Sequence, residues 1–432
     1  MFDLPGLRRH VPLAVALGVD SIGTGISGPL LLLFLTRVAD IPLPQAGLTL
    51  SATYGVALVV PAVVGQIVHR FGGRNVLIAA QVLQAAGLAG LFFARELPAI
   101  AAFALVAAIG QRAFWSSVFS VIADASDSGP ADDKDRWFAF TNMVQNTGFA
   151  LGALAAGGLL LIPGDLPYLL AIGTNAVCFA ASALLLLGDR SGRPEESSRV
   201  GGPSGADGSS GADGASSTDL ASESAAPAGP HRAHRIPSWP YLGLIGVGAL
   251  FAFCSTILGS GLGLYVVDGL SAPAAIVGPL LATNTVLNAI GQAPAVRLTR
   301  RYSRVSVMVA AGLVWGVWGL CTAALGLAPA AVVVPGLVLS VLVYSAAELL
   351  HGPRSIAYAA DAAPPGQRST YLSWFQYSFA IANVAAPGVF AATFSVAPAL
   401  PWIVTSVVAL VACVGLVLVA RTLPPPLPLP LI

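Results

Sequence analysis

The sequence is poor in charged residues. Asp, Glu, Lys and Arg together make up 9% of its 432 residues, whereas a soluble globular domain carries about 25%. The formal net charge is +1, so there is no strongly basic surface of the kind that binds nucleic acid, and no nucleic-acid partner is expected. Hydrophobic residues make up 56% of the chain. This composition predicts an all-α polytopic membrane protein embedded in a lipid bilayer.

Several catalytic and metal-binding patterns are also missing. The four cysteines are far apart inside apolar runs, without a C-x-x-C pair, so neither a disulfide framework nor a metal site is indicated. No Gly-x-x-x-x-Gly-Lys loop occurs, which argues against ATP as the energy source. No Gly-x-Ser-x-Gly or His-Glu-x-x-His occurs either, which argues against a hydrolase. We therefore expect no enzyme activity and no cofactor.

Long apolar runs dominate the sequence. A run of about 20 apolar residues crosses a bilayer as a helix, and twelve such runs occur. Six lie in the first half of the chain: Val11–Phe34, Gln45–Val68, Val76–Phe93, Leu97–Ile122, Trp137–Ile162 and Leu166–Leu187. Six lie in the second half: Tyr241–Val267, Ala274–Val296, Val305–Leu327, Val332–Ala360, Tyr371–Phe394 and Leu400–Ala420.

The central segment separates the two sets of runs. Residues 188–238 are rich in Gly, Ser, Ala and Asp and include the near-repeat GADGSSGADG. Such a segment lacks the apolar content that folding requires, so a disordered tether is predicted. The predicted division is therefore an N-terminal bundle over 1–187, the linker over 188–238, a C-terminal bundle over 239–421 and a Pro-rich tail over 422–432.

The basic residues predict an orientation. With both termini and the linker in the cytoplasm, Arg37 and Arg95 fall outside and Arg112 lies in the membrane, while the other 18 of the 21 basic residues fall inside. Such an excess of cytoplasmic Arg follows the positive-inside rule. Six spans, a long cytoplasmic linker and six more spans resemble the major facilitator superfamily, in which two six-helix halves are related by an axis along the membrane normal.

A basic loop between the second and third spans strengthens this resemblance. The family's signature loop has a Gly, three residues, then Asp-Arg-x-Gly-Arg and a further basic residue. Four residues match it, Gly65, Arg70, Gly72 and Arg74, whereas Gly73 replaces the first of the paired basic residues. His69 stands in place of the Asp that contributes to a latch between the halves, which puts that latch in doubt. A plain positive-inside loop is the alternative interpretation.

Two charged residues lie inside apolar runs of the first half. Insertion scales put the cost of a charge at the bilayer centre at about 2.5–3.5 kcal/mol, so such residues are rare without a partner or a task. Arg112 and Asp20 lie about 15 Å and about 14 Å from the cytoplasmic ends of their spans, at 1.5 Å per residue. The Arg resembles a buried Arg that the family links to proton transfer. We expect the two to pair and to couple transport to protons; the alternative is a purely structural ion pair.

The tenth span carries a third charge. Glu348 is followed by His351 at i+3, on the same helix face. Glu348 is predicted to bind a cationic substrate or to be a second proton site, and His351 to join in proton coupling or to be its hydrogen-bond partner. The following Gly352-Pro353 predicts a break in the helix and resembles family members in which this helix bends.

The fifth span contains glycines at 148, 152 and 157. The stretch resembles the antiporter motif of drug exporters, except that Ala153 replaces the expected Pro. Small residues at this spacing also occur at any close helix–helix contact. Export is therefore favoured only in part by this stretch.

Polar and aromatic residues at helical spacing predict a cavity lining, because such side chains avoid lipid. The predicted substrate cavity comprises Tyr54, Trp115, Gln145, Asn146, Asn284, Asn288, Trp374, Gln376, Tyr377 and Asn383. The alternatives are hydrogen bonds between helices for the amides and lipid contact for the tryptophans. Apolar walls with a few amides and phenols suit an amphipathic organic molecule.

The sequence thus predicts a secondary transporter that exports a drug or natural product by alternating access, driven by a proton gradient. Its partners would be a small-molecule substrate and the lipid bilayer, and the chain is expected to act as a monomer in a bacterial plasma membrane. A proton-coupled importer or a metabolite uniporter is the alternative within this fold. A membrane sensor or assembly factor that transports nothing is the alternative from another class.

Overall fold

The computed structural model describes residues 7–126, 131–188, 237–364 and 367–423. In this part of the chain the secondary structure is helical and no strand occurs. The helices of the first half are α1 (Leu7–Ser27), α2 (Leu31–Arg37), α3 (Leu43–Val56), α4 (Val60–Phe71), α5 (Gly73–Phe93), α6 (Leu97–Ser126), α7 (Ala131–Leu159) and α8 (Leu166–Gly188). Those of the second half are α9 (Trp239–Leu264), α10 (Val277–Thr299), α11 (Arg304–Ala324), α12 (Ala330–Asp361), α13 (Arg368–Phe375), α14 (Tyr377–Phe394) and α15 (Leu400–Ala420).

The predicted spans correspond to these helices. Eleven helical stretches in the described residues are long and apolar enough to cross a membrane. The remaining predicted span corresponds to α7, which runs beside α1 in the first half and α10 in the second. The outward-facing side chains of the bundle include many apolar ones, such as Val177, Leu298 and Val414. These faces suit contact with lipid tails.

Some helices are interrupted where the sequence predicts a continuous run. The first span breaks into α1 and α2 at a short 3₁₀ turn over Gly28–Leu30, and Pro29 within it cannot donate a backbone hydrogen bond. The tenth span behaves in the opposite way. α12 continues through Gly352 and Pro353, so the expected break at this position is wrong. The carbonyl of Gly352 accepts a hydrogen bond from the Ser355 hydroxyl, 2.9 Å away.

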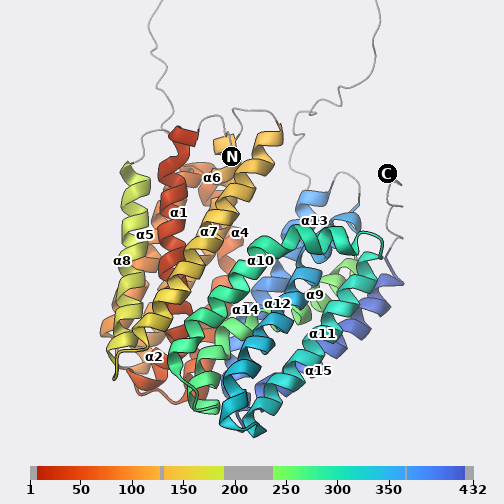
Figure 1. Cartoon of the computed structure of the whole chain (residues 1–432). Coiled ribbons are helices and arrows are strands. Elements are labelled where there is room, and N and C mark those ends of the chain that lie inside the picture. The colour runs from red at the N-terminus through yellow and green to blue at the C-terminus, as the bar shows by residue number, and fades with distance from the viewer. Residues whose placement is uncertain (1–6, 127–130, 189–236, 365–366, 424–432) are drawn as a thin grey trace, which may run out of the picture.

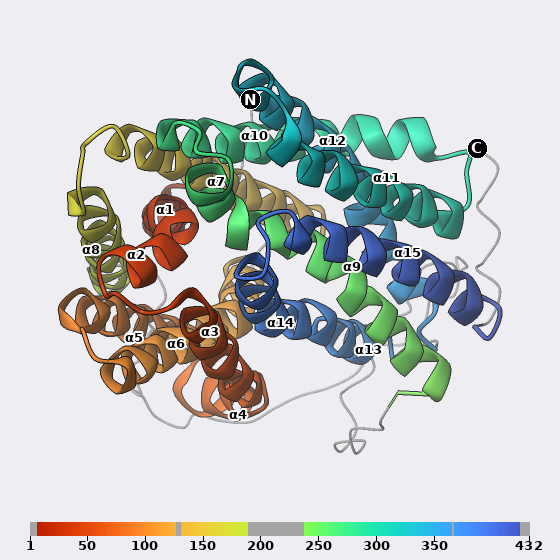
Figure 2. The same ribbon diagram turned by 90° about the horizontal axis from the view of Figure 1, so that it is seen from below.

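The two sets of helices form separate groups in Figure 1, where the first half is red to yellow and the second green to blue. They diverge on the side where the first and last described residues lie and approach one another on the opposite side. We call these the termini side and the far side. Viewed from the far side, α7 lies against α10 and α3 lies against α14 (Figure 2).

Close backbone packing joins the halves at the far side. A β-carbon at Gly278 of α10 would lie 2.1 Å from the carbonyl oxygen of Ala153 in α7, and one at Gly157 would lie 2.8 Å from that of Ala275. Neither position has space for a side chain, so glycine is required for this approach of the two helices. We call the α7–α10 and α3–α14 contacts the far-side seam. The predicted linker lies outside the described residues except at its ends, and the tail lies outside them apart from Thr422 and Leu423.

Candidate functional site

Asp20 lies on α1 and is buried, with 6% of its surface exposed. Its carboxylate accepts a hydrogen bond from Nε2 of Gln81 on α5, at 2.8 Å. The same amide nitrogen donates to the hydroxyl of Ser182 on α8 at 3.0 Å, and Gln84 donates to the oxygen of the Gln81 amide at 3.3 Å. A chain of neutral donors therefore orients the Asp20 carboxylate.

Arg112 does not pair with Asp20 in this conformation. An ion pair requires a nitrogen–oxygen distance of at most 4.0 Å, and no acidic side chain of the described residues lies this close to Arg112. Its guanidinium lies near the phenol of Tyr54, and its Nε is buried without a hydrogen-bond partner among the described residues. The pairing that the sequence predicts is therefore not observed. Equal depth in the membrane does not ensure that two side chains point toward one another.

Glu348 on α12 is the centre of a second polar cluster. Its Oε2 accepts hydrogen bonds from the amides of Asn284 and Asn288 on α10, both at 2.8 Å. Its Oε1 accepts one from the hydroxyl of Tyr344 at 3.0 Å, and Asn284 also donates to Ser345. Of the residues that the structure describes, two amides and a phenol, and no cation, hold the carboxylate.

His351 is not among the partners of Glu348. The imidazole is buried and lies against the rings of Phe251 and Trp315, with centroids 4.7 Å and 5.3 Å away. Its Nε2 has no hydrogen-bond partner within the described structure. Sequence spacing places both residues on neighbouring turns, but the ring points into an aromatic cluster.

Two cavities lie in this region, one beside Asp20 and one between the halves. The first, of about 250 Å³, is inside the N-terminal half and is lined by Asp20, Gln111, Trp115, Gln145 and Asn146, among others. We call it the Asp20 cavity. The second, of about 230 Å³, lies between the halves. We call it the interface cavity, and its lining includes Tyr54, Phe149, Thr256, Ser260 and Asn383.

The remaining predicted cavity residues have other positions. Asn284 and Asn288 contact Glu348, as described above. Trp374 and Tyr377 lie with ring centroids 5.5 Å apart around the junction of α13 and α14, and Gln376 is exposed between them. The structure therefore brings five of the predicted cavity residues onto the two cavities and two more onto Glu348. Trp374, Gln376 and Tyr377 are neither among the residues that line the two described cavities nor among the hydrogen-bond partners of Glu348.

The signature loop lies at the α4–α5 junction. Gly72 has φ +83°, a conformation that favours glycine over other residues. Arg70 is exposed and lies over the ring of Phe71, and Arg74 donates to the carbonyl of Leu186 on α8. Gly65 lies within α4, as its place at the end of the second span predicts. The loop thus forms a tight turn with cations at the termini side.

The predicted antiporter stretch forms close helix contacts. A β-carbon at Gly152 would lie 2.1 Å from the carbonyl of Ile22 on α1, and Ala153 contacts Gly278 of α10. This geometry matches the alternative interpretation, in which small residues permit close helix packing.

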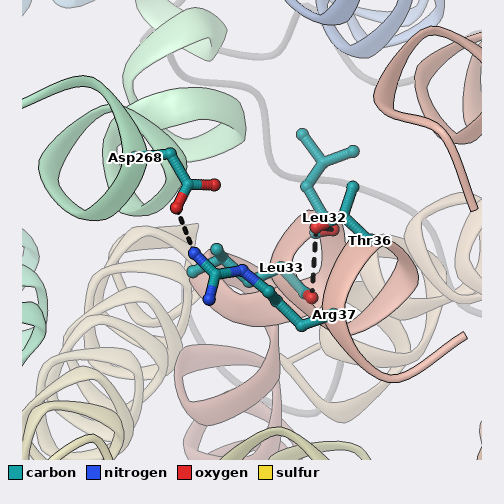
Figure 3. A network of polar contacts seen from close by, with 5 residues as sticks. All are labelled: Leu32, Leu33, Thr36, Arg37 and Asp268. Atoms are coloured by element: carbon teal, nitrogen blue, oxygen red, sulfur yellow. Dashed lines mark hydrogen bonds and ion pairs between the residues drawn. The ribbon is translucent and has the colours of Figure 1, made fainter. Parts of the chain in front are cut away.

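An ion pair that the sequence does not indicate connects the halves at the far side. Arg37 at the end of α2 pairs with Asp268, which lies in the helical turn Tyr265–Gly269 after α9 (Figure 3). The hydroxyl of Thr36 bonds the carbonyl of Leu32 at 3.0 Å and so helps to close the turn that presents Arg37. Gln81 and Tyr344 are also absent from the sequence prediction, although polar residues in apolar runs were the signal that identified Asn284.

Comparisons with known proteins agree with this architecture. The family model described as Major Facilitator Superfamily matches residues 13–254 and 244–431. No curated relative matches the sequence. The fold is similar to a nucleoside transporter, NupG, with a TM-score of 0.71 at 12% identity over 96% of this chain and 99% of that one. It is also similar to a POT family transporter, with a TM-score of 0.72 at 13% identity over 96% of both chains.

A third solved structure, a bacterial homologue of the iron transporter ferroportin in an inward-facing state, gives a TM-score of 0.70 at 16% identity, over 96% of this chain and 99% of that one. At these identities the likeness concerns the fold alone. The family match, in contrast, covers nearly the whole sequence and agrees with the spans, the α4–α5 loop and the two halves. The chain is a transporter, not an enzyme, and it belongs to the major facilitator superfamily.

Proposed function

We propose that this protein is a proton-coupled exporter of a small amphipathic organic molecule, a drug or natural product, that works by alternating access. One observation carries the proposal: each half holds an acid, Asp20 or Glu348, whose hydrogen-bond donors are neutral. A carboxylate away from water and without a cation is costly. A proton or a cationic substrate would neutralise it, so both acids are candidates for coupling.

The lining of the cavities supports the substrate class. The interface cavity is lined mostly by apolar residues, such as Leu50, Phe149 and Leu281, with the polar side chains of Tyr54 and Asn383 among them. Mostly apolar walls with a few placed polar groups are typical of sites for organic ligands. A phosphate would require a cluster of cations, and the only cation proposed for this region is Arg112. Among the similar structures, one is named for nucleosides and one for iron, so their names do not choose a substrate.

We place both termini in the cytoplasm of a bacterial cell, because 18 of the 21 basic residues then lie inside. In this orientation the far-side seam and the Arg37–Asp268 pair close the outer face. The conformation would then be one that receives substrate from the cytoplasm. The protein would act as a monomer with the proton gradient as its energy source, and would need no cofactor.

Asp20 and Glu348 have different roles in this proposal. Asp20 opens onto a cavity within one half and takes up or releases the coupling proton. Glu348 belongs to the other half and is the acid on the substrate side, and it is also a second coupling site because it takes up a proton when no cationic substrate neutralises it. Arg112, on α6 of the same half as Asp20, lies near Tyr54. A movement of α1 against α6 within the N-terminal half would change the distance between Arg112 and Asp20, and with it the free energy of protonating Asp20.

A proton-coupled importer or a uniporter remains the second candidate. A Pro at position 153 would have favoured export, and Ala153 in its place keeps this candidate open. Both candidates use the same cavities and differ in direction and in coupling.

Flux in proteoliposomes tests the proposal. Candidate substrates come from a drug-sensitivity panel in an efflux-deficient bacterial host that expresses the protein. With protein reconstituted and a pH gradient imposed, export predicts that substrate moves against the proton flux and that flux collapses when the gradient is dissipated. Movement with the protons would support import instead. Equal flux with and without the gradient would support a uniporter, and no flux of any substrate would support a role without transport.

A further inference from the structure

The hydroxyl of Tyr344 has two acceptors. It lies within hydrogen-bonding distance of the backbone carbonyl of Ser255 on α9 and of Oε1 of Glu348, one turn along α12. A phenol carries a single hydrogen and can donate to one acceptor at a time. The ring itself is held in place, because it is 2% exposed and packs against Trp318 with centroids 4.8 Å apart. The direction of one O–H bond is therefore the main freedom that the side chain retains.

The protonation state of Glu348 determines that direction. Oε2 already accepts two N–H bonds, from Asn284 and Asn288, so a hydrogen on Oε2 would face two donors. A proton arriving at the carboxyl group is therefore favoured on Oε1, beside Tyr344. The Oε1–H then donates to the phenol oxygen, and Tyr344 turns its own hydrogen to Ser255. With Glu348 ionised, Tyr344 donates to Oε1 instead.

Among the described residues, few other titratable groups surround Tyr344 and Glu348. Within the part of the chain that the structure describes, Cys254 of α9 is the titratable group of a neighbouring helix that lies near Tyr344, and its thiol is directed to the Thr405 carbonyl. α10 contributes the two Asn amides, and α11 contributes the rings of Trp315 and Trp318. His351, on α12 itself, is turned toward Phe251. Within the described residues no charged group other than Glu348 therefore contacts the Tyr344 hydroxyl.

Ser255 connects the alternating hydrogen bond of Tyr344 to the interface cavity. The next residue in α9, Thr256, lines that cavity together with Gly259 and Ser260. The Ser255 carbonyl has two lone pairs and can accept from its helix and from Tyr344 together. When Tyr344 donates to it, α12 and α9 are tied at the cavity wall. When Tyr344 turns away, that tie is lost.

We propose that Tyr344 is a positioning residue that transmits the protonation state of Glu348 to the α9 wall of the interface cavity, through a hydrogen bond that alternates between Glu348 and the Ser255 carbonyl. This inference rests on the proposed coupling role of Glu348. It assigns to Tyr344 no contact with substrate. Its effect is to make the α9–α12 connection strongest when Glu348 is protonated.

The test is the variant Tyr344→Phe in purified, reconstituted protein. Phe keeps the ring that packs on Trp318 and removes the hydroxyl. The C=O infrared band of protonated Glu348, identified by its absence in Glu348→Gln, is titrated with pH. Since the ionised carboxylate loses one donor, the titration midpoint is expected to rise by about half to one pH unit. The pH profile of transport is expected to move in the same direction.

A matched control comes from another buried tyrosine of the same half. Tyr265→Phe removes a hydroxyl that donates to the Thr322 carbonyl at 2.6 Å and lies beside Trp402. It is expected to leave both midpoints unchanged. If Tyr344→Phe does not fold, 3-fluorotyrosine at position 344 keeps the hydroxyl and makes it a stronger donor, and the midpoint is expected to fall.

The outcomes separate the two proposals. An unchanged infrared midpoint and pH profile in Tyr344→Phe, or in the fluorinated protein, would overturn the role of Tyr344 while Glu348→Gln still abolished coupling. If Glu348→Gln retained gradient-driven flux and no carboxyl band titrated, the coupling role of Glu348 itself would be wrong. An equal shift in Tyr265→Phe would mean that removing any buried tyrosine hydroxyl from the C-terminal half has this effect. That result would also overturn the inference.

Discussion

The carboxylate of Asp20 on α1 accepts a hydrogen bond from the side-chain amide of Gln81 on α5, 2.8 Å away. The amide orients the acid but brings no charge to neutralise it. Burial of the acid therefore remains costly unless a proton or a cation arrives. If Asp20 were ion-paired, a basic side chain of the protein would already neutralise its charge.

Replacing Asp20 with Asn removes the charge with little change of shape. We expect gradient-driven flux in proteoliposomes to fall to background, because no proton can be exchanged at this position, while thermal stability is retained. The control is Asp40→Asn, which makes the same change at an exposed acid whose φ of +53° Asn tolerates well. Unchanged gradient-dependent flux in Asp20→Asn would refute the coupling role.

Replacing Glu348 with Gln tests the division of roles between the two acids. The neutral side chain no longer attracts a cationic substrate, so we expect the half-saturating concentration to rise at least about tenfold, equivalent to about 1.4 kcal/mol. Uncharged substrates should be affected less. Binding measured by calorimetry provides the values, with the exposed Glu96→Gln as the control. Equal losses for charged and neutral substrates would contradict the assignment.

The Arg37–Asp268 pair is expected to favour the conformation that is closed at the far side. Both side chains are partly exposed, at 46% and 31%, and exposed pairs contribute about 0.2–1 kcal/mol. Arg37→Ala should therefore change the ratio of conformations by no more than about fivefold. Spin labels replacing Phe71 and Tyr302 at the termini side, in a chain without its four native cysteines, measure that ratio by their separation.

The charge-swapped double variant Arg37→Asp with Asp268→Arg provides the control for this pair. It is expected to restore the original distance distribution, because the attraction is recreated with its direction reversed. High salt should reduce the difference between the wild type and Arg37→Ala. A shift in Arg37→Ala that the double variant and salt both leave untouched would rule out an electrostatic latch.

Two adjacent glycines of α7 allow a comparison within one helix. A β-carbon at Gly157 would lie 2.8 Å from the carbonyl of Ala275 and from a ring carbon of Pro279, whereas Gly158 has nothing within 4 Å. Gly157→Ala should separate the far-side seam and populate the conformation open on that side. Gly158→Ala should leave the distances between spin labels as in the wild type. The reverse ranking of the two variants would show that the seam does not determine the closed conformation.

The sequence was sufficient to predict the spans and the family. Apolar run length determined the helices to within a few residues, because a bilayer requires about 20 apolar residues for each crossing. It could not predict the interruption near Pro29 or the continuity of α12 through Pro353. Whether a Pro breaks a helix depends on which neighbours satisfy the carbonyl groups that it leaves free.

The candidate site was predictable in its acids and less so in their partners. Asp20 and Glu348 were identifiable because charge within an apolar run is rare. The depth of a residue in its span gives its height but not the direction in which its side chain points. Arg112 was therefore assigned to Asp20, although the actual donor is Gln81, and His351 was assigned to Glu348, although its ring faces Phe251.

The far-side seam joins the halves through backbone and very small side chains, as the contact of Gly278 with Ala153 illustrates. Long side chains lose rotamer entropy each time they interlock, but glycine and alanine have almost none to lose. Such a surface has few side chains long enough to interlock with those of the other half. The halves can separate and meet again in every cycle without reordering side chains, so little of the energy of the gradient is spent on repacking.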